Sequence, residues 1–250
     1  MKWVIEHGIF PDETTQAFVQ AVQAAGHDCT KWDDDWWDNH KWQRLGGGPI
    51  LFRGSLENAA RVARELPWTP GSYCDVPAFN CSSWYPQAAE YLVHPAYRIL
   101  PASDLVKHAA AIADEFGGRD QVFVRPDSPL KPFSGRVVEV EGLSLSHLDH
   151  GFYYEDEHLP VVVAPVQELG PEYRLVIVNG EPVAGSHYAA SERIGDSAFF
   201  SDHPAWEQAR KIAAYLTAPE AIYVMDLVES PNGLKLLELI SVQRGGPLRL

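Results

Sequence analysis

The stretch AIYVMDLVESPNGLKLLELIS, from Ala221 to Ser241, has the pattern of a β-hairpin. Two apolar runs of strand length flank the turn-forming sequence Pro-Asn-Gly at positions 231–233. Each run contains one acidic residue among apolar neighbours, Asp226 in the first and Glu238 in the second. The sequence therefore predicts two carboxylates that face each other across a hairpin.

Two carboxylates in such a position require a cation. A charged group among apolar residues is costly unless it is paired, and like charges directly opposite each other repel. Mg²⁺ is a hard cation that prefers oxygen ligands and phosphate partners. One interpretation is that Asp226 and Glu238 bind Mg²⁺ for metal–nucleotide chemistry. The alternative is a cross-strand pair that faces solvent or a neighbouring arginine.

The composition is that of an ordinary globular protein. A chain of 250 residues can form one large domain or two or three small ones, and its 46% apolar residues can fill a sizeable core. A net charge of -14 disfavours nucleic acid. The sequence has no apolar run long enough to span a membrane. We therefore expect neither a nucleic-acid nor a membrane partner, and the oligomeric state stays open.

The N-terminus and the cysteines indicate a soluble cytoplasmic protein. The first ten residues, MKWVIEHGIF, lack the long apolar stretch and the cleavage site of a signal peptide. Cys29, Cys74 and Cys81 are an odd number of cysteines, so we expect reduced thiols. Their spacing does not match the usual zinc-ligand patterns, and we expect no zinc site.

The first hundred residues alternate strand and helix signals, which predicts a small parallel α/β layer. We expect strands at Lys2 to Phe10 and at Pro49 to Arg53. Each is followed by a predicted helix, from residue 11 to Gly26 and from Leu56 to Leu66. Residues 70–101 are rich in Pro, Tyr, Ser and Asn, and we expect a connecting region with short helices there.

The segment KWDDDWWDNHKW, from Lys31 to Trp42, contains four of the eight tryptophans. One interpretation is an exposed aromatic and acidic binding surface. The alternative, which the pattern favours, is a loop whose tryptophans pack beneath the domain.

The remainder of the chain has the pattern of a helix followed by antiparallel strands. Ser103 is predicted to cap a helix that ends at Gly117. Strands are predicted at Gln121 to Pro126, Gly135 to Val140, Leu159 to Leu169, Glu172 to Val178 and Pro182 to Ala190, and a further helix at Pro204 to Leu216.

In this order, the segments resemble the ATP-grasp superfamily of carboxylate–amine ligases. VFVRPDSPLKPFSGRVVEV (122–140) resembles the hairpin that covers the phosphates in that family, and VAPVQELGPEYRLVIVNGEPV (163–183) resembles its nucleotide hinge. The closing hairpin resembles the metal-binding one, and the Arg in RPDS before KPFSG resembles the R2K clade. The resemblance implies an ATP-grasp domain over residues 101–250, in which two α+β subdomains hold ATP between them. It also implies a pre-ATP-grasp-like α/β domain over residues 1–100.

The resemblance assigns phosphate binding to Arg125 and Lys131. Arg125 ends an apolar strand, so its guanidinium can reach phosphate oxygens, and Lys131 lies in a loop able to fold over the nucleotide. Ser134 and Gly135 could offer backbone N–H groups. The alternatives are a strand-end arginine in a salt bridge and a solvated lysine.

The hinge and the strand after it supply the next set of implied residues. Gln167, Glu168 and Leu169, at the end of an apolar strand, would hold adenine. Glu172 would bind the ribose hydroxyls, or it is a surface glutamate. Arg174 lies on the same strand face as Glu172 and would reach the γ-phosphate or the acceptor carboxylate, or it pairs with Glu172.

Arg193, in the loop SERIGDSAFFSD (191–202), would face the transferred phosphate, or it belongs to a surface loop. Taken together, the resemblance implies an ATP- and Mg²⁺-dependent ligase that joins a small-molecule or peptide carboxylate to an amine through an acyl-phosphate. One position departs from the family, because Ile240 replaces the usual Asn metal ligand. The alternatives are therefore a catalytically weakened nucleotide-binding module and an interaction protein that uses the Trp-rich segment.

Overall fold

The computed structural model describes residues 1–46, 48–118, 120–148, 156–188 and 198–243. The strands are β1 (Lys2–Glu6), β2 (Asp28–Trp32), β3 (Pro49–Arg53), β4 (Thr69–Gly71), β5 (Arg98–Pro101), β6 (Gln121–Pro126), β7 (Arg136–Glu139), β8 (Pro160–Pro165), β9 (Glu172–Val178), β10 (Glu181–Tyr188), β11 (Ala198–Phe199), β12 (Ile222–Ser230) and β13 (Gly233–Ser241). The α-helices are α1 (Asp12–Ala24), α2 (Leu56–Glu65), α3 (Cys81–Ala88), α4 (Ala102–Glu115), α5 (Leu145–Leu148) and α6 (Pro204–Tyr215), and short 3₁₀ helices cover Asp34–Trp36, Lys41–Leu45 and Pro77–Phe79.

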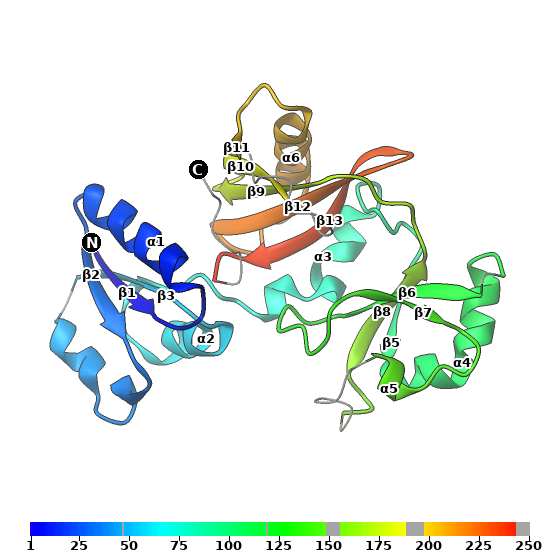
Figure 1. The fold of residues 1–250 in the computed structure, drawn as a ribbon, viewed down its shortest axis with the longest axis horizontal. Helices are drawn as coiled ribbons and strands as arrows, with labels where there is room; N and C mark the ends of the chain where they lie inside the picture. Colours follow the sequence, from blue (N-terminus) through cyan, green and yellow to red (C-terminus); the bar gives the residue numbers. More distant parts are fainter. Residues whose placement is uncertain (47, 119, 149–155, 189–197, 244–250) are drawn as a thin grey trace.

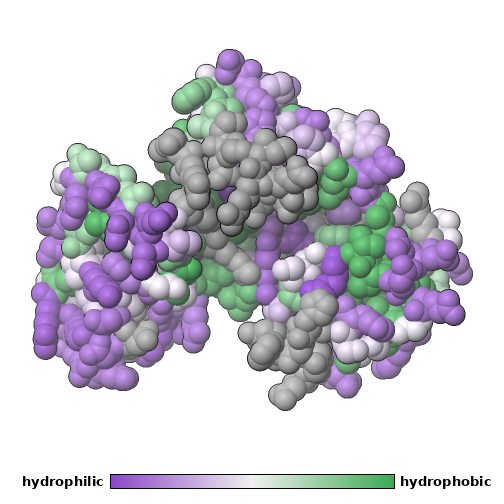
Figure 2. Space-filling model, viewed as in Figure 1, coloured by the Kyte–Doolittle hydropathy of each residue, from purple (hydrophilic) through white to green (hydrophobic). Residues whose placement is uncertain are grey.

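These strands form three separate sheets (Figure 1). The N-terminal sheet has the order β2-β1-β3-β4, the middle sheet β5-β8-β6-β7, and the C-terminal sheet β11-β10-β9-β12-β13. The space-filling view shows the molecule hollowed between its parts, with hydrophilic residues over most of the N-terminal unit (Figure 2). None of the helices in the described part of the chain is long and apolar enough to cross a membrane.

The N-terminal sheet is parallel throughout, as the alternation of strand and helix signals predicts. β1 ends at Glu6 rather than at Phe10, and the sequence did not indicate β2 or β4. β2 lies at the edge of the sheet and is half-exposed, so its mixture of polar and apolar residues hides the strand pattern. The expected connecting region 70–101 does contain a short helix, α3, but it also contains β5.

The tryptophans of the Trp-rich segment pack into the core of the N-terminal unit. Trp32 and Trp36 are 1% and 4% exposed, and their rings stack with centroids 4.8 Å apart. Trp32 also meets Phe52 edge-on, and Arg61 lies 3.9 Å from the centre of the Trp37 ring. The interpretation as a packed loop is confirmed, and the interpretation as an exposed aromatic surface is wrong.

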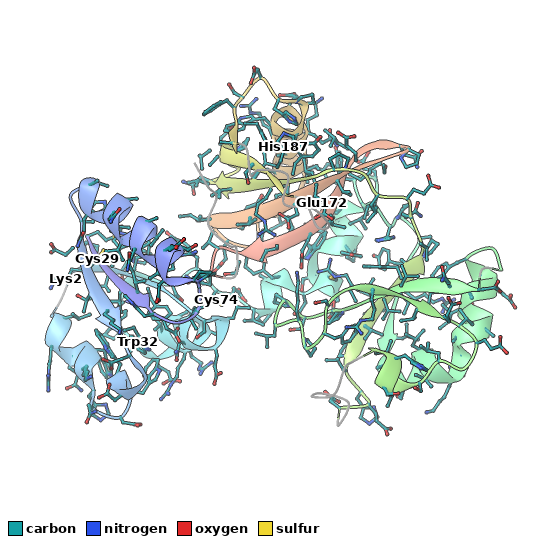
Figure 3. All side chains as sticks on the ribbon, viewed as in Figure 1. Lys2, Cys29, Trp32, Cys74, Glu172 and His187 are labelled. Atoms are coloured by element: carbon teal, nitrogen blue, oxygen red, sulfur yellow. The ribbon has the colours of Figure 1, made fainter. Side chains whose placement is uncertain are left out.

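Figure 3 shows Cys29 and Cys74 at separate places in the same unit as Trp32. Both, like Cys81, are free cysteines, which confirms the expectation of reduced thiols. Burial raises the pKa of Cys74 to about 12 and that of Cys81 to about 11. These thiols are therefore protonated at neutral pH and behave as small apolar side chains.

Two predicted boundaries in the middle sheet are wrong. α4 begins at Ala102, directly after Pro101 ends β5, so Ser103 lies inside the helix and does not cap it. β8 ends at Pro165 rather than Leu169, because its partner β6 begins at Gln121 and a proline offers no N–H to extend the ladder. Gln167 and its neighbours therefore follow the strand as a connection to β9.

Two hairpins of the C-terminal sheet confirm the turn signals. Asn179 and Gly180 join β9 to β10 with φ angles of 49° and 83°, the left-handed pair that a two-residue hairpin turn requires. β12 and β13 pair antiparallel around Pro231–Asn232. A bulge near Leu237 places Leu236 and Leu239 on the apolar face of this hairpin, packed with α6, and leaves Glu238 on the opposite face.

β13 is also attached to the other parts of the chain. Leu236 accepts a backbone hydrogen bond from Val93 and donates one to Tyr91. At the far end of the strand, the Gln243 side chain bonds Phe52 O and Gly54 N, at the carboxyl end of β3. The hairpin therefore contacts both the N-terminal sheet and the segment that follows α3.

Candidate functional site

Asp226 and Glu238 lie directly opposite each other on β12 and β13, as the hairpin pattern predicts. They are only 3% and 8% exposed. Two buried carboxylates at this separation require positive charge nearby. The protein supplies it from three other elements, so the site is a cluster of opposite charges rather than an isolated acidic pair.

Glu238 binds two cations, one from a strand of the middle sheet and one from the loop after that strand. Arg125 Nη2 lies 2.5 Å from Glu238 Oε1, and Lys131 Nζ lies 2.6 Å from Glu238 Oε2. Burial alone would raise the pKa of Glu238, but Arg125 and Lys131 outweigh burial and hold that pKa below its ordinary value. Burial likewise opposes the charge on Arg125, yet Glu238 raises the pKa of Arg125 well above its usual range.

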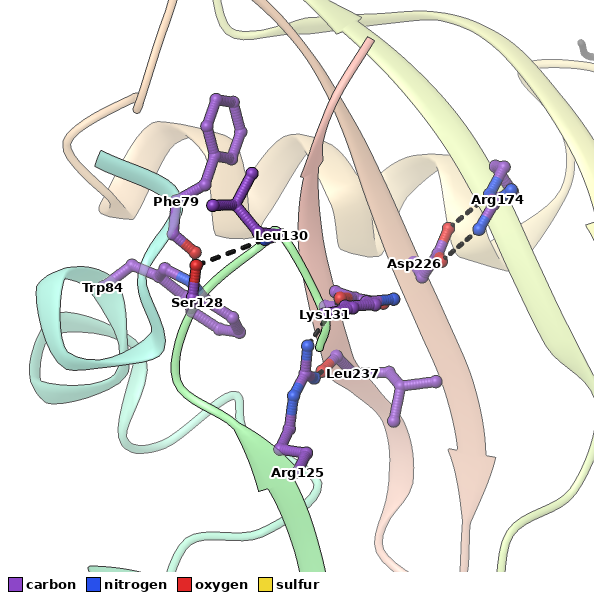
Figure 4. Close-up of polar contacts among 10 residues, drawn as sticks. Phe79, Trp84, Arg125, Ser128, Leu130, Lys131, Arg174, Asp226 and Leu237 are labelled. Atoms are coloured by element: carbon purple, nitrogen blue, oxygen red, sulfur yellow. Dashed lines mark hydrogen bonds and ion pairs between the residues drawn. The ribbon is translucent and has the colours of Figure 1, made fainter. Parts of the chain in front are cut away.

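Asp226 binds Arg174 of the neighbouring strand β9. The contact is bidentate, with Arg174 Nε 2.9 Å from Oδ1 and Arg174 Nη2 2.7 Å from Oδ2 (Figure 4). Arg174 therefore pairs with Asp226, and its charge also acts on Glu172, where it opposes the rise in pKa. Burial raises the pKa of Asp226, and the bonds from Arg174 offset this rise only in part.

The loop that carries Lys131 has two unusual backbone features. Lys131 has a φ of 48°, a left-handed conformation that is uncommon for a residue with a side chain. A Cβ atom on Gly135 would lie 3.0 Å from the Phe123 ring, so the loop returns to β7 close against that ring. The end of this loop therefore lies over the face of β6 that carries Phe123 and Arg125.

Glu172 lies on β9 in the C-terminal sheet, paired with Val228 of β12 (Figure 3). It is half-buried, and its pKa is raised by burial first and by the charge of Asp226 second. Three carboxylates and three cations therefore share the site: Glu172, Asp226 and Glu238 with Arg125, Lys131 and Arg174. The sequence did not show that these charges balance.

The remaining predicted residues lie outside this cluster. Gln167 is half-buried and Glu168 and Leu169 are exposed, in the connection between β8 and β9. Arg193 lies outside the described residues. Ile240 is 4% exposed on the same face as Glu238, so an apolar side chain occupies the position at which the resemblance implies a third metal ligand.

Sequence reasoning missed two groups at the site. Arg125 Nη1 donates to Leu237 O, a bulge carbonyl that no side-chain pattern reveals. Asp127 accepts hydrogen bonds from both the backbone N–H and the hydroxyl of Ser82, at the first turn of α3. A carboxylate two residues after a strand-end arginine was the available signal for Asp127.

The donor chemistry of the site fits Mg²⁺. In the described part of the chain, no group of three or more His, Cys, Asp or Glu side chains could hold a metal by itself. Mg²⁺ does not need such a group, because it is usually bound by one or two carboxylates together with substrate phosphates and water. Asp226 and Glu238 are two adjacent carboxylates beside cations that suit phosphate.

Two α+β units bring cations and carboxylates to one buried cluster, an arrangement whose charges suit a phosphate-bearing ligand. The family model of the ATP-grasp domain, R2K clade family 2, matches residues 101–243. The chain therefore belongs to this family of the ATP-grasp superfamily, as the motifs predict. The family and the fold place it among ATP-dependent ligases in general.

Solved structures show the same fold at low sequence identity. A RimK-domain ATP-grasp protein from Sphaerobacter thermophilus DSM 20745 has a TM-score of 0.62 at 14% identity, over 98% of this chain and 92% of that one. The D-cycloserine synthetase DcsG gives 0.60 at 15%, over 96% and 91%. D-alanine–D-alanine ligase from Bacillus anthracis, complexed with ATP, gives 0.62 at 13%, over 97% and 86%. No curated protein matches the sequence.

Proposed function

We propose that the protein is an ATP- and Mg²⁺-dependent ligase that joins a carboxylate to an amine through an acyl-phosphate. The observation that carries this proposal is the meeting of Arg125 and Lys131 at Glu238, directly opposite Asp226. Arg125 and Lys131, each more than a hundred residues away in the sequence, converge on the buried carboxylate of Glu238. Such an arrangement provides cations for phosphate oxygens beside oxygen ligands for a divalent metal.

Each residue of the cluster has a proposed role. Arg125 and Lys131 bind phosphate oxygens of ATP, and Arg174 orients the γ-phosphate or the acceptor carboxylate. Glu172, at the start of β9, binds the ribose hydroxyls. Asp226 and Glu238 would hold Mg²⁺, which would supply neutralisation of charge on the phosphates.

Two further roles rest on the family resemblance. Gln167, Glu168 and Leu169 connect the two subdomains, and we assign adenine binding to this connection. Arg193 is assigned to the transferred phosphate. We also retain the division into a pre-ATP-grasp-like domain (1–100) and an ATP-grasp domain (101–250) as part of the proposal.

The reaction proceeds in two displacements. A carboxylate oxygen of the first substrate attacks the γ-phosphorus, the bond from that phosphorus to the bridging oxygen breaks, and ADP leaves. The nitrogen of the amine then attacks the acyl carbon, phosphate leaves, and the amine loses a proton to form an amide. The cations of the site stabilise charge on the transferred phosphoryl group, which is the main requirement of this chemistry.

The proposed substrates are a small-molecule or peptide carboxylate and an amine. Structures similar to this chain include DcsG, a D-cycloserine synthetase, and the ligase PsnB complexed with precursor peptide PsnA2 and AMPPNP. The second of these has a TM-score of 0.53 at 13% identity. Both substrate sizes are therefore included in the proposal and in its test.

Ile240 favours a second candidate function, a nucleotide-binding module with weakened catalysis. It is buried on the face of the metal carboxylates and has no oxygen to offer. A site that lacks the third ligand can retain nucleotide while it positions the metal poorly. This candidate predicts binding of MgATP with no ADP formed in the presence of any acceptor.

The test combines a binding and a turnover measurement. MgATP is expected to raise the melting temperature of the purified chain, and ADP release is measured with panels of amino acids and short peptides. Lys131→Asn is the matched variant, since Asn tolerates the left-handed backbone of this position and lacks the amine. We expect it to weaken MgATP binding at least tenfold. Absence of any Mg²⁺-dependent nucleotide shift in the wild type would contradict both candidates, whereas binding without ADP release would support the second.

A further inference from the structure

Asp127 connects the end of β6 to α3. It is 7% exposed, and its carboxylate accepts hydrogen bonds from Ser82 N at 2.7 Å and from Ser82 Oγ at 2.8 Å. Its backbone also takes part, because Cys81 N donates to Asp127 O at 2.9 Å. Three hydrogen bonds therefore join the two segments in one place.

This pairing replaces the ordinary cap of α3. Asn80 occupies the N-cap position, yet its side chain makes no cap hydrogen bond, and Asn80 Oδ1 is buried without a partner among the described residues. Asp127 instead satisfies the first two N–H groups of the helix. Its charge also suits the positive end of the helix. The first turn of α3 is therefore completed by a residue from the middle sheet.

α3 in turn leads to the strand that carries Glu238. Tyr91 and Val93, shortly after the helix, form backbone hydrogen bonds with Leu236, two residues before Glu238. Arg125, two residues before Asp127, contacts Glu238 directly. The end of β6 is therefore connected to the strand that carries Glu238 in two ways: directly through Arg125, and indirectly through Asp127, α3 and Leu236.

Helix α3 also bears on the position of Arg125. Cys81 and Tyr85 of α3 lie near enough to Arg125 for its charge to lower their pKa values against the larger rise from burial, so this helix lies beside the guanidinium. Asp127 is two residues from Arg125, and it begins the loop that carries Lys131. A shift of the β6 end relative to α3 would move both cations relative to Glu238.

We propose that Asp127, held by Ser82, is a positioning residue that sets Arg125 and Lys131 at the correct separation from the metal carboxylates. It touches neither nucleotide nor metal and acts through Arg125. This inference rests on the proposed function, since it concerns the binding of the phosphates of ATP.

The test compares the affinities of MgATP and adenosine by calorimetry in the wild type and in variants of Asp127 and Ser82. Asp127→Ala removes both hydrogen bonds to Ser82, and we expect it to weaken MgATP roughly tenfold. Adenosine has no phosphate, so its affinity is expected to stay unchanged. Asp127→Asn can still accept from Ser82 N, and its amide can donate to Ser82 Oγ, so it is expected to restore most of the affinity. Ser82→Ala is expected to weaken MgATP less than Asp127→Ala does.

Ser83→Ala is the matched control on the same helix. Its hydroxyl bonds Pro77 O and does not reach Asp127, so MgATP binding should not change. A second control asks whether Asp127 acts through Arg125. In an Arg125→Met background, Asp127→Ala is expected to have little further effect on the affinity for MgATP. If Asp127→Ala fails to fold, Ser82→Ala tests the inference in its place, and a weakened affinity for MgATP with unchanged affinity for adenosine is the expected result.

The outcomes separate this inference from the proposed function. Tighter MgATP binding in both Asp127 variants would show that the charge merely repels phosphate, and would overturn the inference. Loss of thermal stability with unchanged MgATP affinity would overturn it as well, in favour of a structural cap. A wild-type chain that binds no magnesium nucleotide would overturn the proposed function, and the inference with it.

Discussion

Two acidic regions of this chain look alike in sequence and differ in structure. The Trp-rich segment, Lys31 to Trp42, carries aspartates at the surface, where Asp33 and Asp35 form exposed ion pairs with Lys41. The closing hairpin carries Asp226 and Glu238 inside the molecule, paired with arginines and a lysine from other elements. Carboxylates of the same kind are therefore exposed to water in the first region and buried in the second.

The difference shows what makes an acidic residue a candidate for function. Exposed pairs are screened by water and salt, and they contribute little to stability or binding. Buried charges interact strongly and must be matched, so removal of one partner leaves another uncompensated. In the first region, the tryptophans pack in the core, and the ion pairs of the aspartates with Lys41 lie at the surface.

The largest expected effect is that of Glu238→Gln. This substitution keeps the shape of the side chain, but it leaves Arg125 and Lys131 without their shared anion. We expect the free energy of unfolding to fall by about 3–5 kcal/mol and MgATP binding to weaken by roughly a hundredfold or more, since about 1.4 kcal/mol corresponds to a factor of ten. Denaturant unfolding and calorimetry measure the two effects.

The matched control in the exposed region is Asp35→Asn. Its ion pair with Lys41 is at the surface, so we expect no resolvable change in either measurement. Equal effects of the two substitutions on stability would remove the distinction between the regions.

Trp32→Ala is expected to have an intermediate effect that separates stability from binding. Trp32 is 1% exposed and stacks on Trp36, so its removal should lower the free energy of unfolding by about 3–5 kcal/mol. The affinity of the folded chain for MgATP should stay the same, because the segment lies in the N-terminal unit. Measurement below the unfolding transition is required, and a changed affinity would assign the segment to the nucleotide site.

The smallest effect concerns the pH dependence of stability at the two hairpin carboxylates. The pKa of Glu238 is lowered from 4.5, so its stabilisation is present above pH 4.5 and is lost as the pH falls through the lowered value. The pKa of Asp226 is raised from 3.8, so its contribution is present below pH 3.8 and is lost as the pH rises through the raised value. The stability lost in Glu238→Gln should therefore shrink toward low pH, and that lost in Asp226→Asn should shrink as pH rises. Unfolding curves from pH 3 to 7 measure both trends, and parallel trends would contradict the assignment.

Local patterns predicted much of the fold. The alternation of strands and helices in the first hundred residues predicted a parallel sheet, and Asn179–Gly180 and the Pro-Asn-Gly turn predicted two hairpins. The failures lie where local signals are weak or conflict with pairing. β2 is a half-exposed edge strand, and Ser103 has the residue type of a helix cap although its helix begins one residue earlier, directly after β5.

The sequence by itself predicted a hairpin with one carboxylate on each strand, because two apolar runs flank a turn signal. The bulge at Leu237, which brings Glu238 directly opposite Asp226, is visible only in the structure, since the two-residue turn alone would pair Asp226 with Leu237. The sequence also determined the family, because motifs in a fixed order identify it. Only the tertiary structure decided which cations these carboxylates meet. Arg125, Lys131 and Arg174 reach them across sheets and loops, and such long-range contacts depend on how whole units pack, which no local pattern records.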